Sequence, residues 1–114
     1  MSKFLVLYEA PVAVLDEWMK TPPEKRKAEE EKMMAEWKKW ISENASKFAD
    51  QGAGVGRPKK VAASGVTDTR NDILLYAIVN AESLDAAAKI FRSHPHLQIP
   101  QSSIEVMELK SHGM

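Results

Sequence analysis

The stretch Asp72-Ile-Leu-Leu-Tyr-Ala-Ile-Val-Asn80 decides which fold this sequence predicts. In a β-strand, successive side chains alternate between two faces. One face of this strand would carry Ile73, Leu75, Ala77 and Val79, and the other Leu74, Tyr76 and Ile78. Because both faces are apolar, both have to be covered, so the strand is expected near the middle of its sheet. The rest of the chain must supply the two covers.

Composition limits the classes of protein that fit. The 114 residues, 44% of them hydrophobic, suit one globular domain over residues 1–114, with a helical insertion at about residues 10–30. Sixteen basic and sixteen acidic residues leave no net charge, so neither nucleic acid nor a membrane is expected as a partner. The absence of cysteine excludes disulfides and thiolate metal sites. The apolar run Phe4–Tyr8 is too short for a signal peptide or a membrane span, so a soluble cytoplasmic protein is expected.

Three further segments have strand composition. Phe4–Tyr8 is apolar on both faces and predicts a second central strand. Lys59–Val66 predicts a weaker strand, which the polar turn at residues 66–71 would join to the 72–80 strand as a hairpin. Ser103–Leu109 predicts the fourth strand, with Ile104 and Val106 on one face and Glu105 and Met107 on the other.

Helical patterns fill the intervals between these strands. Val12–Met19 can form two turns, with Val14, Leu15 and Trp18 on one side. Thr21-Pro-Pro-Glu24 is typical of a helix start, and residues 25–32 suit a solvated helix. The main helix is then predicted from Met33 to a glycine stop at Gly52. Its apolar stripe would consist of Met34, Trp37, Ile41, Ala45 and Phe48.

A second helix is expected after Ser83, which can cap it. Leu84, Ala87, Ala88 and Phe91 give this helix one apolar side, and Pro95 stops it. The predicted order is strand, helix, strand, strand, helix, strand. This is the α+β, ferredoxin-like βαββαβ arrangement, a four-stranded antiparallel sheet with two helices on one face.

Two helices cover only one face of such a sheet, although both central strands are apolar on both sides. Four strands of about five residues, spaced by about 4.8 Å, leave roughly 300 Å² of the other face in projection. Its accessible area would be at or above the upper end of what monomers expose. With one chain type, the simplest cover is a second copy, so a homodimer through the sheet face is predicted.

Several motifs resemble the YCII-related (DGPF-containing) family over nearly the whole chain except residues 11–30. They are Phe4-Leu-Val-Leu-Tyr8, the paired tryptophans before Asp50-Gln-Gly52, Ala81-Glu-Ser-Leu-Asp-Ala86, His94-Pro-His-Leu97 and Ser103-Ile-Glu-Val106. The resemblance implies a dimeric α+β barrel, in which two ferredoxin-like sheets form a barrel between them.

The family resemblance also implies acid–base chemistry by a histidine on the first helix and an aspartate that precedes a proline. In this chain Trp37 stands about where that histidine is expected, and His94 replaces the aspartate. The DGPF tetrapeptide is absent as well, because Thr69-Arg70-Asn71 follows Thr67-Asp68. An imidazole oriented by a carboxylate is therefore not available from these two positions.

The candidate ligand pocket consists of Tyr8, Trp37, Asn44, His94 and Glu105. His94 is the candidate catalytic residue, a proton carrier whose charged form the helix dipole would favour. Asn44 either faces the pocket or bonds to nearby backbone, and Glu105 either approaches His94 or forms a rim salt bridge. Trp37 is either core packing or an aromatic wall. No cofactor or metal is expected, because the pair His94 and His96 lacks a third ligand.

Three functions follow from this pattern. The first is a dimeric small-molecule-binding or accessory protein with a pocket beside Trp37. The second is a small acid–base enzyme, an isomerase or lyase acting on a small organic acid, with His94 in a cleft. The third is a purely structural dimerisation module without a cavity.

Overall fold

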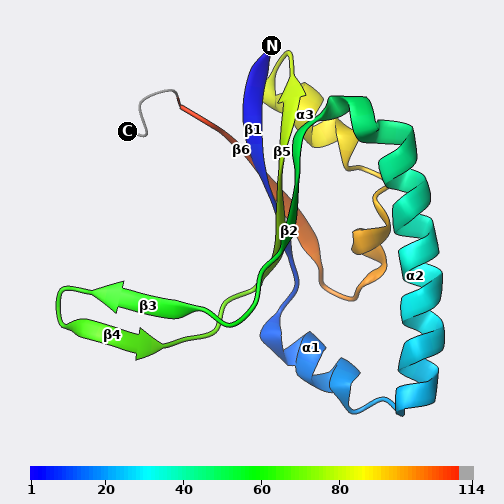
Figure 1. The fold of residues 1–114 in the computed structure, drawn as a ribbon, viewed down its shortest axis with the longest axis vertical. Coiled ribbons are helices and arrows are strands. Elements are labelled where there is room, and N and C mark those ends of the chain that lie inside the picture. Colours follow the sequence, from blue (N-terminus) through cyan, green and yellow to red (C-terminus); the bar gives the residue numbers. More distant parts are fainter. Residues whose placement is uncertain (111–114) are drawn as a thin grey trace.

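The structure, a computed structural model, describes residues 1–110 as one antiparallel sheet with helices on one side and a projecting hairpin on the other (Figure 1). The strand order is β2 (Phe48–Gly54), β5 (Ile73–Ala81), β1 (Ser2–Glu9) and β6 (Ser103–Glu108). This is the predicted ferredoxin-like α+β order, and β5 and β1 are central in it, as their two-sided apolar pattern predicts. The prediction of the sheet class is confirmed.

Helices α2 (Pro23–Asn44) and α3 (Leu84–Ile90) cover the same face of the sheet (Figure 1). A shorter helix, α1 (Val12–Met19), lies beyond the lower end of β1, and a 3₁₀ turn, η2 (Pro95–Gln98), follows α3. The Ser83 hydroxyl accepts a hydrogen bond from the Ala86 N–H at 3.1 Å, which confirms the predicted cap of α3.

The core lies between the sheet and these two helices. Residues two apart on β1 and β5 point to this side, and their partners across the strands share it. The core consists of Phe4, Val6, Tyr8, Trp40, Ala77, Val79, Ala81, Ala87 and Phe91. Trp37, Ile41, Leu75, Ile104 and Val106 pack against it while partly exposed.

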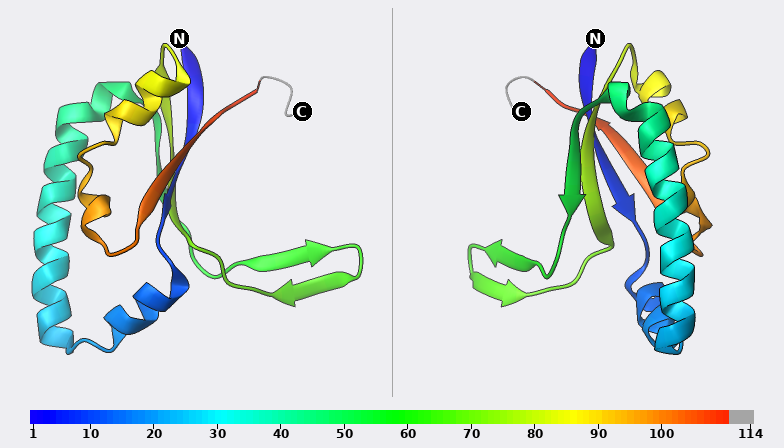
Figure 2. Two further views of the ribbon diagram at one scale, coloured as in Figure 1. Left: turned by 180° about the vertical axis from the view of Figure 1, so that it is seen from behind. Right: turned by 45° about the vertical axis from the view of Figure 1, so that its right-hand side comes forward.

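The predicted hairpin partner of β5 is wrong. The edge strand beside β5 is β2, whereas Lys59–Val66 falls in a separate two-stranded hairpin. We call this hairpin, residues 59–68, the arm; it consists of β3 (Lys59–Ala62) and β4 (Gly65–Asp68). The arm leaves the lower end of the sheet on the side opposite the helices (Figures 1 and 2).

The edge strand was mispredicted because the main helix ends earlier than its apolar spacing predicts. Helix α2 ends at Asn44, a 3₁₀ turn, η1 (Ala45–Lys47), follows, and Phe48 begins β2. The Phe48 ring still meets Trp40, at a centroid distance of 5.8 Å, so it joins the expected apolar cluster from a strand. The helical spacing of Phe48 therefore identified its packing neighbours but not its backbone conformation.

Gly52 does not stop a helix; it forms a bulge in β2. The register of β2 against β5 shifts on both sides of Asp50, and Gly52 has φ +71°. The Asp50 carboxylate accepts a hydrogen bond from the Gly52 N–H at 2.7 Å. A Cβ at residue 52 would overlap the carbonyl oxygen of Tyr76. Positive φ suits a bulge and a helix end equally, so the glycine alone does not distinguish them.

The opposite side of the sheet, which we call the outer face, has no helix on it (Figure 2). Its apolar side chains are all partly exposed, and they come from β1, β5 and β6. They are Leu5, Leu7, Leu74, Tyr76, Ile78 and Met107. The prediction that the helices leave one apolar sheet face uncovered is confirmed.

Candidate functional site

An aromatic cluster fills the space between α2 and the lower half of β1. The Trp37 and His94 rings lie 4.3 Å apart, nearly perpendicular, and Tyr8 lies 5.0 Å from His94 (centroid distances). The Trp40 ring also contacts His94, at a centroid distance of 4.3 Å. The structure thus brings together three of the residues proposed from the sequence, namely Tyr8, Trp37 and His94.

His94 is held by a backbone hydrogen bond and is almost completely buried. Only 2% of its surface is exposed, and its Nδ1 accepts a hydrogen bond from the His96 N–H at 2.9 Å. Since Nδ1 is an acceptor, the neutral ring carries its proton on Nε2. Among residues 1–110 this Nε2 has no hydrogen-bond partner. The imidazole therefore presents one unpaired N–H to the surrounding aromatic rings.

This environment makes His94 a neutral group. Burial, and then the nearby His96, lower the pKa of His94 from 6.5 to about 4. The sequence predicted that a helix dipole would favour the charged form, and that prediction is wrong. The dipole effect is limited to the last turn of a helix and is small, whereas desolvation of a buried imidazolium costs more.

His96 anchors the same loop to the sheet. Its Nε2 lies 2.9 Å from the Glu9 carbonyl oxygen, and its own carbonyl accepts from the Ser102 hydroxyl at 3.0 Å. Only 1% of its surface is exposed, and burial lowers its pKa. The sequence did not identify His96 as buried, because the helical and strand periods do not extend into this loop.

An open pocket of about 720 Å³ is lined by residues of α1, α2 and η2, including Trp37, whereas neither His94 nor His96 lines it. Its lining is mostly apolar, with Glu29, Glu30 and Lys38 as the charged members. The apolar lining consists of Leu15, Trp18, Met33, Met34, Trp37, Leu75, Ile99 and Pro100. Leu15 and Trp18 were predicted on one side of their helix, but the sequence did not show that this side faces α2.

The other two proposed pocket residues lie elsewhere. The Asn44 amide donates to the Trp40 carbonyl at 2.9 Å and accepts from the Lys47 ammonium at 3.0 Å. Its polar group is thus satisfied next to its own helix end. Glu105 is opposite Leu7 on β1, on the outer face, because strand alternation sends its neighbours Ile104 and Val106 to the helix side.

Glu105 instead pairs with Glu9, a residue that the sequence analysis did not single out. Burial first, then a hydrogen bond that the protonated Glu9 donates to Glu105, and the negative charges of Glu105 and Asp72, raise the pKa of Glu9. One Glu9 carboxylate oxygen is buried and unpaired within the described chain. Two carboxyl groups therefore share the lower end of the outer face.

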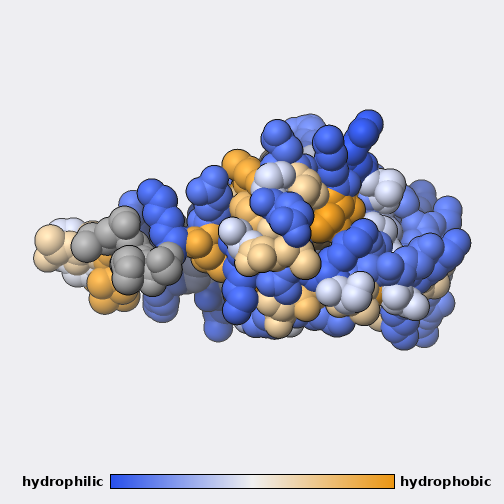
Figure 3. Space-filling model, turned by 90° about the horizontal axis from the view of Figure 1, so that it is seen from above, coloured by the Kyte–Doolittle hydropathy of each residue, from blue (hydrophilic) through white to orange (hydrophobic). Residues whose placement is uncertain are grey.

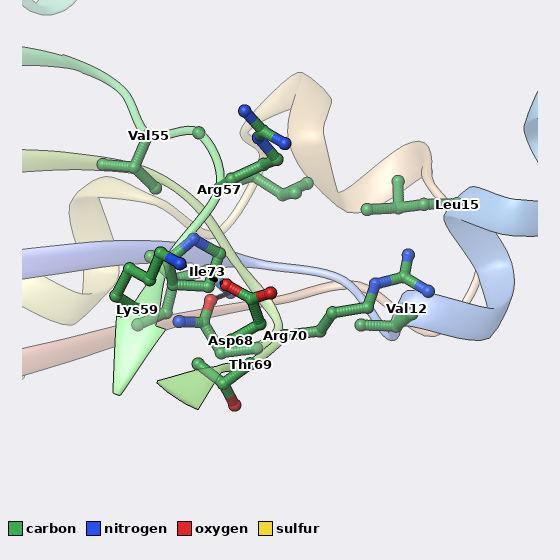
Figure 4. A pocket seen from close by; sticks show the side chains of 13 residues that line it. Val12, Leu15, Val55, Arg57, Lys59, Asp68, Thr69, Arg70 and Ile73 are labelled. Atoms are coloured by element: carbon green, nitrogen blue, oxygen red, sulfur yellow. Dashed lines mark hydrogen bonds and ion pairs between the residues drawn. The ribbon is translucent and has the colours of Figure 1, made fainter. Parts of the chain in front are cut away.

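A second hollow of about 660 Å³ lies where the arm meets α1 (Figure 4). Two ion pairs border it: Lys59 with Asp68 at 2.5 Å and Arg70 with Asp16 at 2.9 Å. Arg57, Val12 and Ile73 also line it. Its cations are mainly neutralised by carboxylates of the same chain, so its geometry does not select an anionic ligand.

No known protein family profile matches this chain. No curated protein sequence matches it either. Among solved structures, the chain is similar to 5-chloro-2-hydroxyhydroquinone dehydrochlorinase (TftG) from Burkholderia phenoliruptrix AC1100, in complex with 2,5-dihydroxybenzoquinone. The identity is 13%, the TM-score is 0.45, and all of both chains is covered.

Residues 1–110 contain no group of three or more His, Asp or Glu side chains placed to hold a metal ion. No helix in that range is both long and apolar enough to cross a membrane.

Proposed function

We propose that this protein is a homodimeric, small-molecule-binding protein, a divergent relative of the YCII-related family. The observation that carries the binding function is the apolar pocket beside Trp37. Its volume of about 720 Å³ falls within the range of small-molecule sites, about 300–1,000 Å³. Two tryptophans, several aliphatic side chains and a few charges at the pocket suit a mostly apolar organic molecule with one polar group.

A thermal-shift screen of small aromatic and aliphatic compounds, with and without a carboxylate, tests the binding function. For a compound that binds, we expect the Ile99→Gln variant to weaken binding at least tenfold, because Ile99 lines the pocket. Leu97→Gln is the matched control, since Leu97 is 41% exposed and outside this lining. Equal affinity in both variants, or a complete absence of hits, would contradict the proposal.

The homodimer is supported by the outer face. Six partly exposed apolar side chains on adjacent strands form one continuous surface that no helix covers. Contiguous apolar patches of this kind mark interfaces in soluble proteins. Sedimentation equilibrium should give a dimer for the wild type and a monomer for Leu7→Lys, which places a charge at the centre of the face. Leu84→Lys, at a 40% exposed site on α3, should remain a dimer.

The second candidate, an acid–base enzyme with His94 as proton carrier, has one observation in its favour. The Nε2 of His94 is a buried, unpaired donor one ring away from the pocket. That candidate also requires a cleft at His94 and a carboxylate or amide beside it. In the described chain His94 is buried and does not line the pocket, and the bond to Nδ1 comes from a backbone N–H. The geometry therefore supports binding better than proton transfer.

A further inference from the structure

The arm is the part of the chain with the least internal support. All eight of its strand residues are exposed, and β3 and β4 pair only with each other among the described residues. An isolated two-stranded hairpin is marginally stable in water. The arm therefore needs another surface to pack against if it is to hold this extended position.

The arm carries an apolar pair of its own. Val61 and Val66 are directly opposite each other across the two strands, so their side chains share one face. They are 77% and 64% exposed. Figure 3 shows hydrophobic surface on the part of the molecule that extends to the left, among hydrophilic residues. A surface of this kind gains stability only when another apolar surface covers it.

We propose that the arm packs against a second copy of the chain and completes the dimer interface; this inference rests on the homodimer proposed above. The arm leaves the sheet on the same side as the outer face (Figure 2). A copy that packs sheet to sheet, about 10 Å away, therefore lies beside the arm. In a two-fold dimer each copy places its arm along the other.

The area of the outer face supports a role for the arm. The four strands contain seven, nine, eight and six residues. They present roughly 480 Å² in projection, whereas a stable specific interface buries about 800 Å² of accessible surface per partner. Side chains make accessible area larger than projected area, but the sheet face is small for an interface by itself. One face of a ribbon of two four-residue strands adds roughly 130 Å² in projection. The arm thus extends the interface by about a quarter.

The charges of the two surfaces are complementary. The arm contains Lys59 and Lys60 against one acid, Asp68, which gives a net charge of two minus one, or +1, and Arg57 lies just before it. The lower end of the outer face carries the carboxyl groups of Glu9 and Glu105. A positive arm beside a carboxyl pair on the other copy fixes the orientation of the dimer and disfavours other registers.

Sedimentation equilibrium of three full-chain variants tests the arm. The Val61→Thr/Val66→Thr variant keeps the branched shape and strand preference but makes the arm polar, and we expect its dimer dissociation constant to rise at least tenfold. A short-arm variant, in which Asn-Gly replaces residues 60–67 between the paired Lys59 and Asp68, should dissociate further. Ala13→Ser, which adds a hydroxyl at an exposed site on α1, should dimerise like the wild type.

The outcomes separate the two proposals. A wild-type dimer with unchanged dissociation constants in both arm variants would overturn the arm inference and leave the dimer intact. A monomeric wild type would overturn both. Far-UV circular dichroism of the variants checks that the sheet and helices are retained.

A cross-linking experiment locates the arm directly. Equal amounts of ¹⁴N- and ¹⁵N-labelled protein are mixed and treated with a carbodiimide, which joins lysine amines to carboxyl groups. We expect peptides of mixed isotope content that link Lys59 or Lys60 to Glu9 or Glu105. Arm cross-links found only within one isotope label would place the arm on its own copy and overturn the inference.

Discussion

Acidification should destabilise this protein through His94, and the size of the effect follows from its burial. The pKa of His94 is about 4 in the folded chain and about 6.5 in the unfolded chain. The unfolded state therefore binds the proton more tightly. The contribution of the neutral His94 to the stability of the folded state is fully present above pH 6.5 and is lost as the pH falls toward 4. At about 1.36 kcal/mol per pH unit, the difference of about 2.5 units corresponds to at most about 3 kcal/mol.

The His94→Asn variant isolates this contribution. An asparagine oxygen can accept the His96 N–H, as a cap residue does, but it has no group that titrates in this range. At pH 7 the smaller side chain leaves a cavity, which costs about 1–3 kcal/mol of unfolding free energy. Between pH 7 and 4 the variant should lose up to about 3 kcal/mol less than the wild type, so the two stability curves converge.

Guanidinium unfolding at four pH values between 7 and 4, at one fixed protein concentration, measures the two curves. NMR of the His94 ring gives its midpoint directly, and we expect a value near 4. His94→Leu is the second variant; it also removes the acceptor of the buried His96 N–H and should cost about 1–3 kcal/mol more than His94→Asn. Parallel pH curves for wild type and His94→Asn, or a His94 midpoint near 6.5, would refute the reasoning.

Three further predictions concern stability. Gly52→Ala should destabilise the fold by about 3 kcal/mol or more in denaturant unfolding, because the added Cβ meets the Tyr76 carbonyl and the residue has positive φ. Gly56→Ala is the control: the site has open space around it, so its unfolding free energy should stay within about 0.5 kcal/mol of the wild type. Ser83→Ala should cost about 1 kcal/mol, seen as a lower denaturant midpoint, because α3 loses its cap. Because the pKa of Glu9 is raised, the native state binds this proton more tightly than the unfolded state, and the unfolding free energy falls as the pH rises through that pKa. Glu9→Gln should flatten this dependence of the unfolding free energy on pH, measured by guanidinium unfolding at several pH values.

The sequence predicted the sheet because burial dictates its pattern. The strands β1 and β5 are apolar on both faces, and only a central position in a sheet with two covers explains such segments. The same residues predicted the uncovered outer face, since two helices cover one side. Alternation along β6 likewise shows which of its residues face the helices, and it places Glu105 away from them. These inferences depend on which side of a strand a residue occupies, and period-two alternation fixes that.

The edge strand could not be predicted in the same way. Phe48 continues a helical spacing, and the following residues, Ala49 to Gly54, have little β-propensity. They form β2 because β5 offers an unpaired edge and because Gly52 can adopt the bulge that fits them to it. Lys59–Val66 has the better strand composition, yet it forms an arm outside the sheet. Pairing to an available edge, a tertiary effect, outweighed local preference here.

The candidate site is also shaped by tertiary effects that local sequence patterns do not predict. The sequence identified Tyr8, Trp37 and His94 because each lies in a periodic or motif-bearing segment, and they do meet in space. It did not reveal that Trp37 lines the open pocket whereas His94 does not, since that depends on how the loop at residues 94–98 packs against α2. The loop is held there by bonds from backbone and side chain groups of His96, which leave no periodic signature. The histidine proposed as proton carrier and the pocket proposed for ligand binding, which share one region in sequence, therefore have only Trp37 in common: Trp37 lines the pocket and contacts His94, which does not line it.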